Sequence, residues 1–98
     1  EVYEITGRFA FERSDLHLKE EQKQAIIEKC VRGEYDSFGD YKVEWMDDLD
    51  GYKYFFNENE WFMIRPAGSE PVLRTYAESE SKEGALAIIK AGYDTLMN

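Results

Sequence analysis

The sequence predicts an α+β fold, a two-layer domain in which an antiparallel sheet has two helices packed on one of its faces. Two observations support this prediction. Short runs rich in aromatic and β-branched residues are separated by tight turn signals, which is typical of consecutive antiparallel hairpins. Two longer segments carry apolar residues at helical spacing. The expected order is β-α-β-β-β-β-α, in a single domain that covers residues 1–98.

The first third of the chain is expected to hold one strand and one helix. Residues 2–13 mix aromatic and β-branched residues, so we expect them to be extended and to include the first strand. Residues 19–32 are predicted to form a helix that ends at Gly33, the residue type favoured at a helix C-terminus. The apolar stripe of this helix consists of Ala25, Ile26, Ile27, Cys30 and Val31.

The remaining two thirds are expected to supply four strands and a closing helix. Turn signals lie at Asp50-Gly51 and at residues 57–59. A helix capped by Ser79 or Ser81 then runs to about residue 97. The four strands are expected at residues 41–46, 52–56, 61–65 and 72–78. The inner face of the closing helix is expected to consist of Leu86, Ile89, Tyr93 and Leu96 or Met97.

The charge balance argues against two classes of partner. The chain has 12 Lys and Arg against 21 Asp and Glu, a formal net charge of -9. Nucleic-acid-binding proteins usually present a basic face, so we expect no nucleic-acid partner. We also expect no membrane partner, because an anionic surface would repel the chain and no apolar run is long enough to span a bilayer. The single cysteine, Cys30, excludes an intrachain disulfide and indicates a reducing, cytoplasmic setting.

The segment between the last two predicted strands carries residues suited to binding an anion. Pro66 and Pro71 fix the backbone where the loop begins and ends. Gly68 allows a backbone conformation that other residues avoid, and consecutive N–H groups in such a turn can form an anion-binding nest. Ser69 adds a hydroxyl donor.

Two arginines flank this loop. Arg65 lies at the end of one predicted strand and Arg74 near the start of the next, so hairpin pairing is expected to bring both guanidinium groups to the same end of the sheet. A guanidinium group matches phosphate oxygens with two parallel hydrogen bonds and remains charged at any relevant pH. Each charge-assisted hydrogen bond contributes roughly 1.5–3 kcal/mol. The loop is therefore predicted to bind a phosphate group.

Residues 61–78 resemble the signature of the α-D-phosphohexomutases. The last domain of these enzymes has a loop Arg-Pro-Ser-Gly-Thr-Glu-Pro, followed by Leu-Arg and Tyr-x-Glu. Ala67 stands where that family usually has Ser, which removes one hydroxyl, and Ser69 stands where Thr is usual, which keeps it. We expect these two changes to weaken or retune phosphate binding without abolishing it. The matching positions are Arg65, Pro66, Gly68, Glu70, Pro71, Leu73, Arg74, Tyr76 and Glu78.

The resemblance implies the C-terminal, fourth domain of a larger phosphoglucomutase or phosphomannomutase. Such enzymes move a phosphoryl group between the 1- and 6-positions of a hexose, and their fourth domain holds the phosphate that is not reacting. It implies no catalytic residue in this domain, no activity of the domain alone, and Mg²⁺ on another domain. The implied partners are the other domains of the polypeptide and the phosphosugar. The implied phosphate-binding residues are Arg65, Ala67, Gly68, Ser69 and Arg74, and the implied loop-ordering residues are Pro66, Glu70 and Pro71.

Two other functions remain open from the residues themselves. A free-standing phosphate- or metabolite-binding regulatory module would have its own initiator Met. The chain begins at Glu1, so we expect a part of a longer protein instead. A nucleic-acid-binding domain of similar fold would need a basic sheet face, which the acidic composition disfavours. Without the resemblance, Arg65 and Arg74 could also be ordinary surface cations.

Several other residues favour structural interpretations. The acidic run 47–51 lacks the Asp-Gly-Asp-x-Asp spacing of the family's magnesium loop, so we interpret it as a solvated turn. His17 is expected to be structural or exposed, and Cys30 to be a core residue. Aromatic side chains could suggest base stacking, but a packed core or a domain interface is the preferred interpretation. These aromatic residues are Tyr54, Phe55, Phe56, Trp61 and Phe62.

Overall fold

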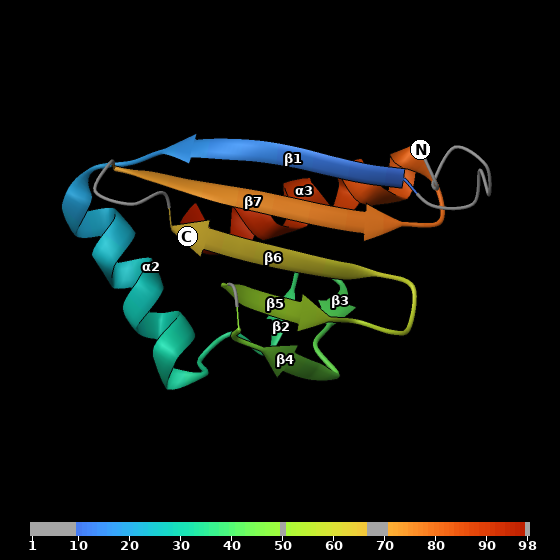
Figure 1. Ribbon diagram of the computed structural model, residues 1–98, viewed down its shortest axis with the longest axis horizontal. Helices are drawn as coiled ribbons and strands as arrows, with labels where there is room; N and C mark the ends of the chain where they lie inside the picture. Colours follow the sequence, from blue (N-terminus) through green and yellow to red (C-terminus); the bar gives the residue numbers. More distant parts are fainter. Residues whose placement is uncertain (1–9, 50, 67–70, 98) are drawn as a thin grey trace.

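A five-stranded antiparallel sheet forms the centre of the computed structural model, which describes residues 10–49, 51–66 and 71–97 (Figure 1). The strand order β1-β7-β6-β5-β4 places β6 and β7 in the interior of the sheet. The α+β prediction is confirmed. The strands of this sheet are β1 (Ala10–His17), β4 (Trp45–Asp47), β5 (Tyr52–Phe55), β6 (Trp61–Pro66) and β7 (Val72–Ser79). The remaining elements are α2 (Glu20–Arg32), α3 (Lys82–Met97) and a two-stranded sheet of β2 (Ser37–Phe38) and β3 (Tyr41–Lys42).

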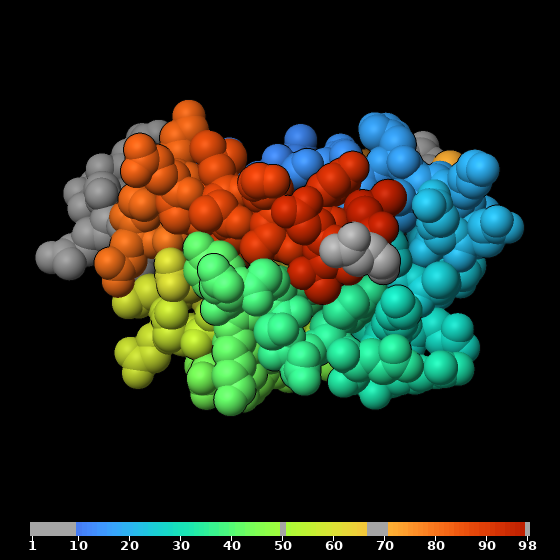
Figure 2. Space-filling model, turned by 180° about the vertical axis from the view of Figure 1, so that it is seen from behind, coloured from blue at the N-terminus to red at the C-terminus, as the bar shows by residue number. Residues whose placement is uncertain are grey.

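One face of the large sheet is covered and the other is open. Seen from behind in Figure 2, α3 crosses the covered face, with the β2–β3 sheet and α2 beside it. The small sheet also rests on α3, because the Gly39 N–H donates to the Thr95 hydroxyl at 3.3 Å. The described part of the chain therefore has the two layers that the sequence predicts, with β2–β3 as an additional part of the second layer.

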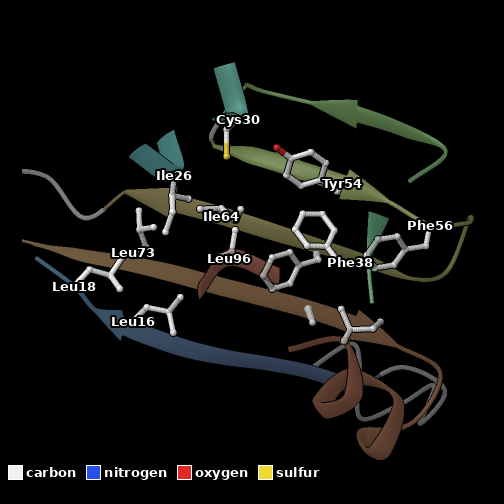
Figure 3. Packing of buried hydrophobic residues seen from close by; sticks show 13 residues of the cluster. Leu16, Leu18, Ile26, Cys30, Phe38, Tyr54, Phe56, Ile64, Leu73 and Leu96 are labelled. Carbon is white, nitrogen blue, oxygen red and sulfur yellow. The ribbon is translucent and has the colours of Figure 1, made fainter. Parts of the chain in front are cut away.

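The core lies between these two layers (Figure 3). Phe62 and Ile64 of β6 and Leu73 of β7 are fully buried, because alternate residues of each strand point toward the helices. Phe38 of the small sheet packs into the same core. Further members come from β1, β5 and the two helices: Leu16, Tyr54, Ile26, Cys30, Ile88 and Leu96.

The first strand includes residues 10–13 of the predicted range 2–13 but continues beyond it to His17. β1 begins at Ala10 and pairs continuously with β7 from Ala10–Ser79 to His17–Val72. Its polar run, from Glu12 to Asp15, hides the strand signal because β1 is an edge strand with one face open to solvent. The predicted residues 2–9 lie outside the described residues.

The single strand predicted at residues 41–46 is also wrong, because two separate strands occupy this segment. The chain changes its hydrogen-bonding partner between Val43 and Glu44. The Val43 N–H donates to the Asp36 carbonyl at 3.0 Å, whereas the Glu44 N–H donates to the Phe55 carbonyl at 2.7 Å. β3 therefore belongs to the small sheet and β4 to the large one, and β2 is an element that the sequence analysis missed.

The ends of the helices agree with the predictions, but their buried faces differ. Gly33 ends α2 with a φ of 72°, and the Ser81 hydroxyl accepts a hydrogen bond from the Gly84 N–H at 3.0 Å and so caps α3. Of the stripe predicted for α2, Ile26 and Cys30 are buried. Ala25 and Val31 of that stripe are exposed and Ile27 is half-buried.

The inner face of α3 is rotated by about one residue from the prediction. Leu86, Tyr93 and Met97 are exposed and Ile89 is only half-buried, so of the predicted set Leu96 alone is fully inside. A β-carbon at Gly92 would clash with the Phe62 ring. α3 therefore packs closely against β6 through small residues such as Gly92. The larger side chains of Leu86, Tyr93 and Met97 are exposed to solvent. The buried residues are Ala85, Ile88, Gly92 and Leu96.

The core contains ionisable groups whose burial predicts a loss of stability in alkali. Burial raises the pKa of the Cys30 thiol from 9.0 to about 11 and that of Tyr35 from 10.0 to about 12, to which the charges of Cys30 and Glu34 also contribute. The unfolded chain releases these protons first, so stability is complete below pH 9 and is lost as the pH rises toward 12. We expect the urea midpoint of unfolding to fall between pH 8.5 and pH 11.

A tyrosine-to-phenylalanine variant provides the control for this alkaline effect. The Tyr35 hydroxyl is buried without a hydrogen-bond partner among the described residues, so Tyr35→Phe should leave stability near pH 7 unchanged or slightly raised. Above pH 10 its urea midpoint should fall less steeply than that of the unmodified chain. A midpoint that stays constant through pH 11, or equal slopes for the two proteins, would contradict the prediction.

Candidate functional site

The open face of the sheet carries Arg65 and Arg74, the two arginines that the sequence analysis singled out. The register of β6 against β7 places three side-chain pairs on this face, because their neighbours along each strand point into the core. Arg65 lies opposite Arg74 at the end of the sheet from which the 66–71 connection leaves. The two other pairs are Met63 with Tyr76 and Trp61 with Glu78.

Arg65 and Arg74 form a cross-strand pair of like charge. Both side chains are exposed, and within residues 10–49, 51–66 and 71–97 no ion pair or hydrogen bond of either guanidinium group is found. Like charges placed directly opposite each other destabilise a sheet. The repulsion between the two guanidinium groups therefore destabilises the sheet when no ligand is bound. An anion bound between the two groups would remove this repulsion.

The ends of the intervening loop are tied to the sheet. Pro66 is the last residue of β6 and pairs with Leu73, and the Pro71 carbonyl accepts a hydrogen bond from the Leu18 N–H at 2.9 Å. The ordering role expected of the two prolines stays a prediction, because most of the loop between them lies outside the described residues. The other predicted site residues, Ala67, Gly68, Ser69 and Glu70, lie outside the described residues.

β1 adds charged residues that the sequence analysis did not place at this site. Asp15 lies opposite Arg74, and Arg13 lies opposite Tyr76 one pair further along. Three of the four arginines that the structure describes, Arg13, Arg65 and Arg74, therefore lie on one face of a chain whose net charge is -9. The sequence could have revealed this cluster of arginines only with the correct bounds of β1, because the pairing of β1 with β7 then places Arg13 opposite Tyr76.

An aromatic strip, which consists of Phe55 and Trp61, crosses the open face next to these charged residues. The Trp61 Nε1–H donates to Glu78 Oε1 at 2.8 Å, which fixes the indole ring. The Lys53 ammonium lies 4.2 Å from the centroid of the Trp61 ring and 5.0 Å from that of Phe55, in cation–π geometry. Of the five aromatic residues for which a core or interface position was expected, Tyr54, Phe56 and Phe62 are buried, whereas Phe55 and Trp61 belong to this strip.

The β4–β5 hairpin packs closely against β6 beside Arg65. Gly51 has a φ of 150°, and a β-carbon there would lie 2.8 Å from the Ile64 carbonyl oxygen and 3.5 Å from the Arg65 β-carbon. Other residue types rarely adopt this backbone conformation, and the short distance leaves no room for a side chain. Gly51 therefore lets the hairpin approach the strand that carries Arg65.

The remaining candidate residues take ordinary structural positions. Asp47 and Asp48 are exposed, and Asp50 lies outside the described residues. Within the described ranges, no group of three or more His, Cys, Asp or Glu side chains is arranged to hold a metal ion. His17 is exposed at the end of β1, and Cys30 is a core residue as expected. Neither α2 nor α3, the helices of the described part, has the length and apolarity needed to cross a bilayer.

Residues 10–92 match the model of a family described as "Phosphoglucomutase/phosphomannomutase, C-terminal domain". The chain belongs to this family. The match covers the whole sheet and most of α3, so the phosphoglucomutase/phosphomannomutase C-terminal domain accounts for both the fold and the Arg65–Arg74 hairpin. The resemblance seen in residues 61–78 thus extends over nearly the entire chain.

Relatives of this C-terminal domain are parts of much longer chains. A "Probable phosphoglucosamine mutase" of Methanobrevibacter smithii is 33% identical over 76 residues, which are 78% of this chain and 17% of that protein. A "Phosphoglucomutase/phosphomannomutase" of Thermococcus kodakarensis is 31% identical over 84 residues, 86% of this chain and 17% of the relative. The chain thus spans 17% of the length of these mutases.

A solved structure has the same fold. It is a phosphoglucomutase/phosphomannomutase family protein from Burkholderia thailandensis, with a TM-score of 0.59 and 17% sequence identity. The alignment covers 89% of this chain and 17% of that one. At this identity the likeness concerns the fold, and the family assignment depends on the sequence matches.

Proposed function

We propose that this domain binds the non-reacting phosphate of a hexose phosphate, while other domains of the same polypeptide transfer a phosphoryl group between the 1- and 6-positions of the sugar. The observation that carries the proposal is the exposed Arg65–Arg74 pair on two adjacent strands. The further proposed donors are the N–H groups of Ala67 and Gly68 and the hydroxyl of Ser69. Pro66, Glu70 and Pro71 are proposed to order the loop.

The electrostatics of the pair support a phosphate ligand. Two guanidinium groups repel each other across the strands, and a phosphate dianion between them cancels that repulsion. Each arginine can offer two parallel N–H donors to two phosphate oxygens. With roughly 1.5–3 kcal/mol for each charge-assisted hydrogen bond, the pair and a few loop N–H groups suffice for specific binding of one phosphate.

In this proposal the domain contributes binding energy and not chemistry. Holding the distal phosphate positions the sugar for reaction at a site on other domains, one of which carries the Mg²⁺. Binding can help to close the domain over the substrate by a hinge motion. The domain alone has no catalytic residue and is inactive. We assign it to a cytoplasmic enzyme on the basis of its single, buried Cys30.

The test is an amide NMR titration of the 98-residue chain with glucose 1-phosphate, with glucose as the uncharged comparison. We expect weak binding, with a Kd on the order of 1 mM or roughly 4 kcal/mol, and shifts around Arg65 and Arg74. Arg65→Ala should weaken this binding roughly 10- to 100-fold, because it removes charge-assisted hydrogen bonds to the phosphate.

Arg32→Ala is the matched control. It removes the same charge from an exposed arginine on α2, whose guanidinium pairs with Glu28 at 2.9 Å. This variant should bind glucose 1-phosphate as the unmodified chain does. Equal losses in the two variants would mean that net charge, and not a specific site, governs binding. Shifts on the sheet with none at Arg65 and Arg74 would favour the metabolite-binding module instead.

A further inference from the structure

A pocket opens on the sheet face beside Arg65, on the side away from Arg74. Its volume is about 290 Å³, close to the lower limit of roughly 300 Å³ for small-molecule sites. It is framed by β4, β5, β6 and the β4–β5 turn. Its lining residues are Asp47, Leu49, Gly51, Lys53, Met63 and Arg65. Arg65 thus lines this pocket and is also a member of the arginine pair.

Asp47 presents a carboxylate whose orientation is fixed. Its Oδ1 accepts a hydrogen bond from the Leu49 N–H at 3.0 Å, which leaves the other oxygen available. Lys53 lies directly opposite Asp47 in the register, yet its ammonium lies over the Trp61 ring. Among the described residues Asp47 has no ion-pair partner. The pocket therefore contains one carboxylate oxygen that is free to accept hydrogen bonds.

The other walls of the pocket combine the Lys53 side chain with apolar surface. Met63 on β6 and Leu49 in the turn offer side chains without hydrogen-bonding groups, and the close approach at Gly51 brings the turn against β6. A sugar ring has both hydroxyl groups and apolar C–H groups. An oriented acceptor beside apolar side chains, with the cations Lys53 and Arg65 also lining the pocket, suits a sugar that carries a phosphate at one end.

We propose that this pocket holds the ring of the phosphosugar whose phosphate is bound by Arg65 and Arg74, and that Asp47 accepts hydrogen bonds from ring hydroxyl groups. The inference rests on the proposed phosphate-binding function and adds a sugar-recognising residue to it. Asp47 also gives the site a preference: its negative charge disfavours a bare phosphate ion beside Arg65, whereas ring hydroxyls turn the same carboxylate into a partner.

The experiment compares two ligands, glucose 6-phosphate and inorganic phosphate, by amide NMR titration of the 98-residue chain. In Asp47→Asn the amide oxygen can still accept the Leu49 N–H, so the turn is retained. We expect this variant to bind glucose 6-phosphate roughly tenfold more weakly, because a charge-assisted hydrogen bond becomes a neutral one. Its affinity for inorganic phosphate should be unchanged or higher.

Asp48→Asn is the matched control, since it makes the same charge change at the next residue, which is exposed and outside the pocket. It should alter neither affinity. If Asp47→Asn changes neither affinity, or lowers both equally, the sugar pocket is refuted while Arg65-dependent phosphate binding still stands. If the unmodified chain binds neither ligand, the phosphate-binding function fails and the sugar pocket fails with it.

Discussion

Replacing Phe38 by alanine is expected to lower the free energy of unfolding by about 3–5 kcal/mol, the usual cost of removing a fully buried phenylalanine. The Phe38 side chain is fully buried, and its ring centroid lies 5.0 Å from those of both Tyr54 and Phe62. Truncation would leave a cavity between the small sheet and the large one, which the surrounding rings cannot fill without moving. Urea unfolding followed by circular dichroism measures the effect.

Phe11→Ala supplies the comparison for Phe38. The Phe11 side chain is 52% exposed on the open face, where it contacts the rings of Trp61 and Tyr76. The same chemical change there should cost roughly 1 kcal/mol or less, since little apolar area returns to water. If Phe38→Ala lowered the free energy of unfolding as little as Phe11→Ala is expected to, the β2–β3 sheet would not be part of the cooperative core.

The second large effect is expected at Gly92, where valine should destabilise the domain by about 3 kcal/mol. A β-carbon at this position would overlap the Phe62 ring, and valine adds two further methyl groups. To accommodate them, α3 would have to move away from β6 and lose contacts along its buried face. Helix propensity alone favours valine over glycine slightly, so a large loss can only come from overpacking. The urea midpoint measures the change.

Ala87→Val tests whether valine in α3 is harmful in itself. Ala87 is exposed on the same helix, so this substitution should cost no more than about 0.7 kcal/mol through helix propensity. If Gly92→Val lowered stability as little as Ala87→Val, this result would contradict the close contact between Gly92 of α3 and Phe62 of β6. If both variants were equally harmful, the helix and not its contact with Phe62 would be the sensitive feature.

The sequence predicts the Arg65–Arg74 hairpin well because the information is local. Pro66 and Pro71 mark where the strands end, and a short connection between antiparallel strands leaves few registers. Which residues of α3 face inward is not local information. Leu86, Tyr93 and Met97 have helical spacing as good as that of the buried set. Tertiary contacts, such as that of the Phe62 ring with Gly92, decide between the two faces.

The pocket beside Arg65 depends on information that the sequence carries only weakly. It needs Asp47 opposite Lys53, and this pairing follows from a β4 strand of three residues inside a segment that looks like one longer strand. The change of partner between Val43 and Glu44 produces that break, and no turn residue marks it. Long-range hydrogen bonding, and not local propensity, determines this part of the site.

The position of the two arginines within the sheet has a mechanical consequence. β6 and β7 are interior strands, and the ladder that joins them runs from Trp61–Glu78 to Pro66–Leu73. Such ladders belong to the part of a protein that opens only in global unfolding, so their amide hydrogens exchange slowly with solvent. Local separation of β6 from β7 should therefore be rare, and the anion of the proposed function would have to leave Arg65 and Arg74 without it. A pull on such an anion would then act on the whole sheet, and through it on the domain as one rigid body.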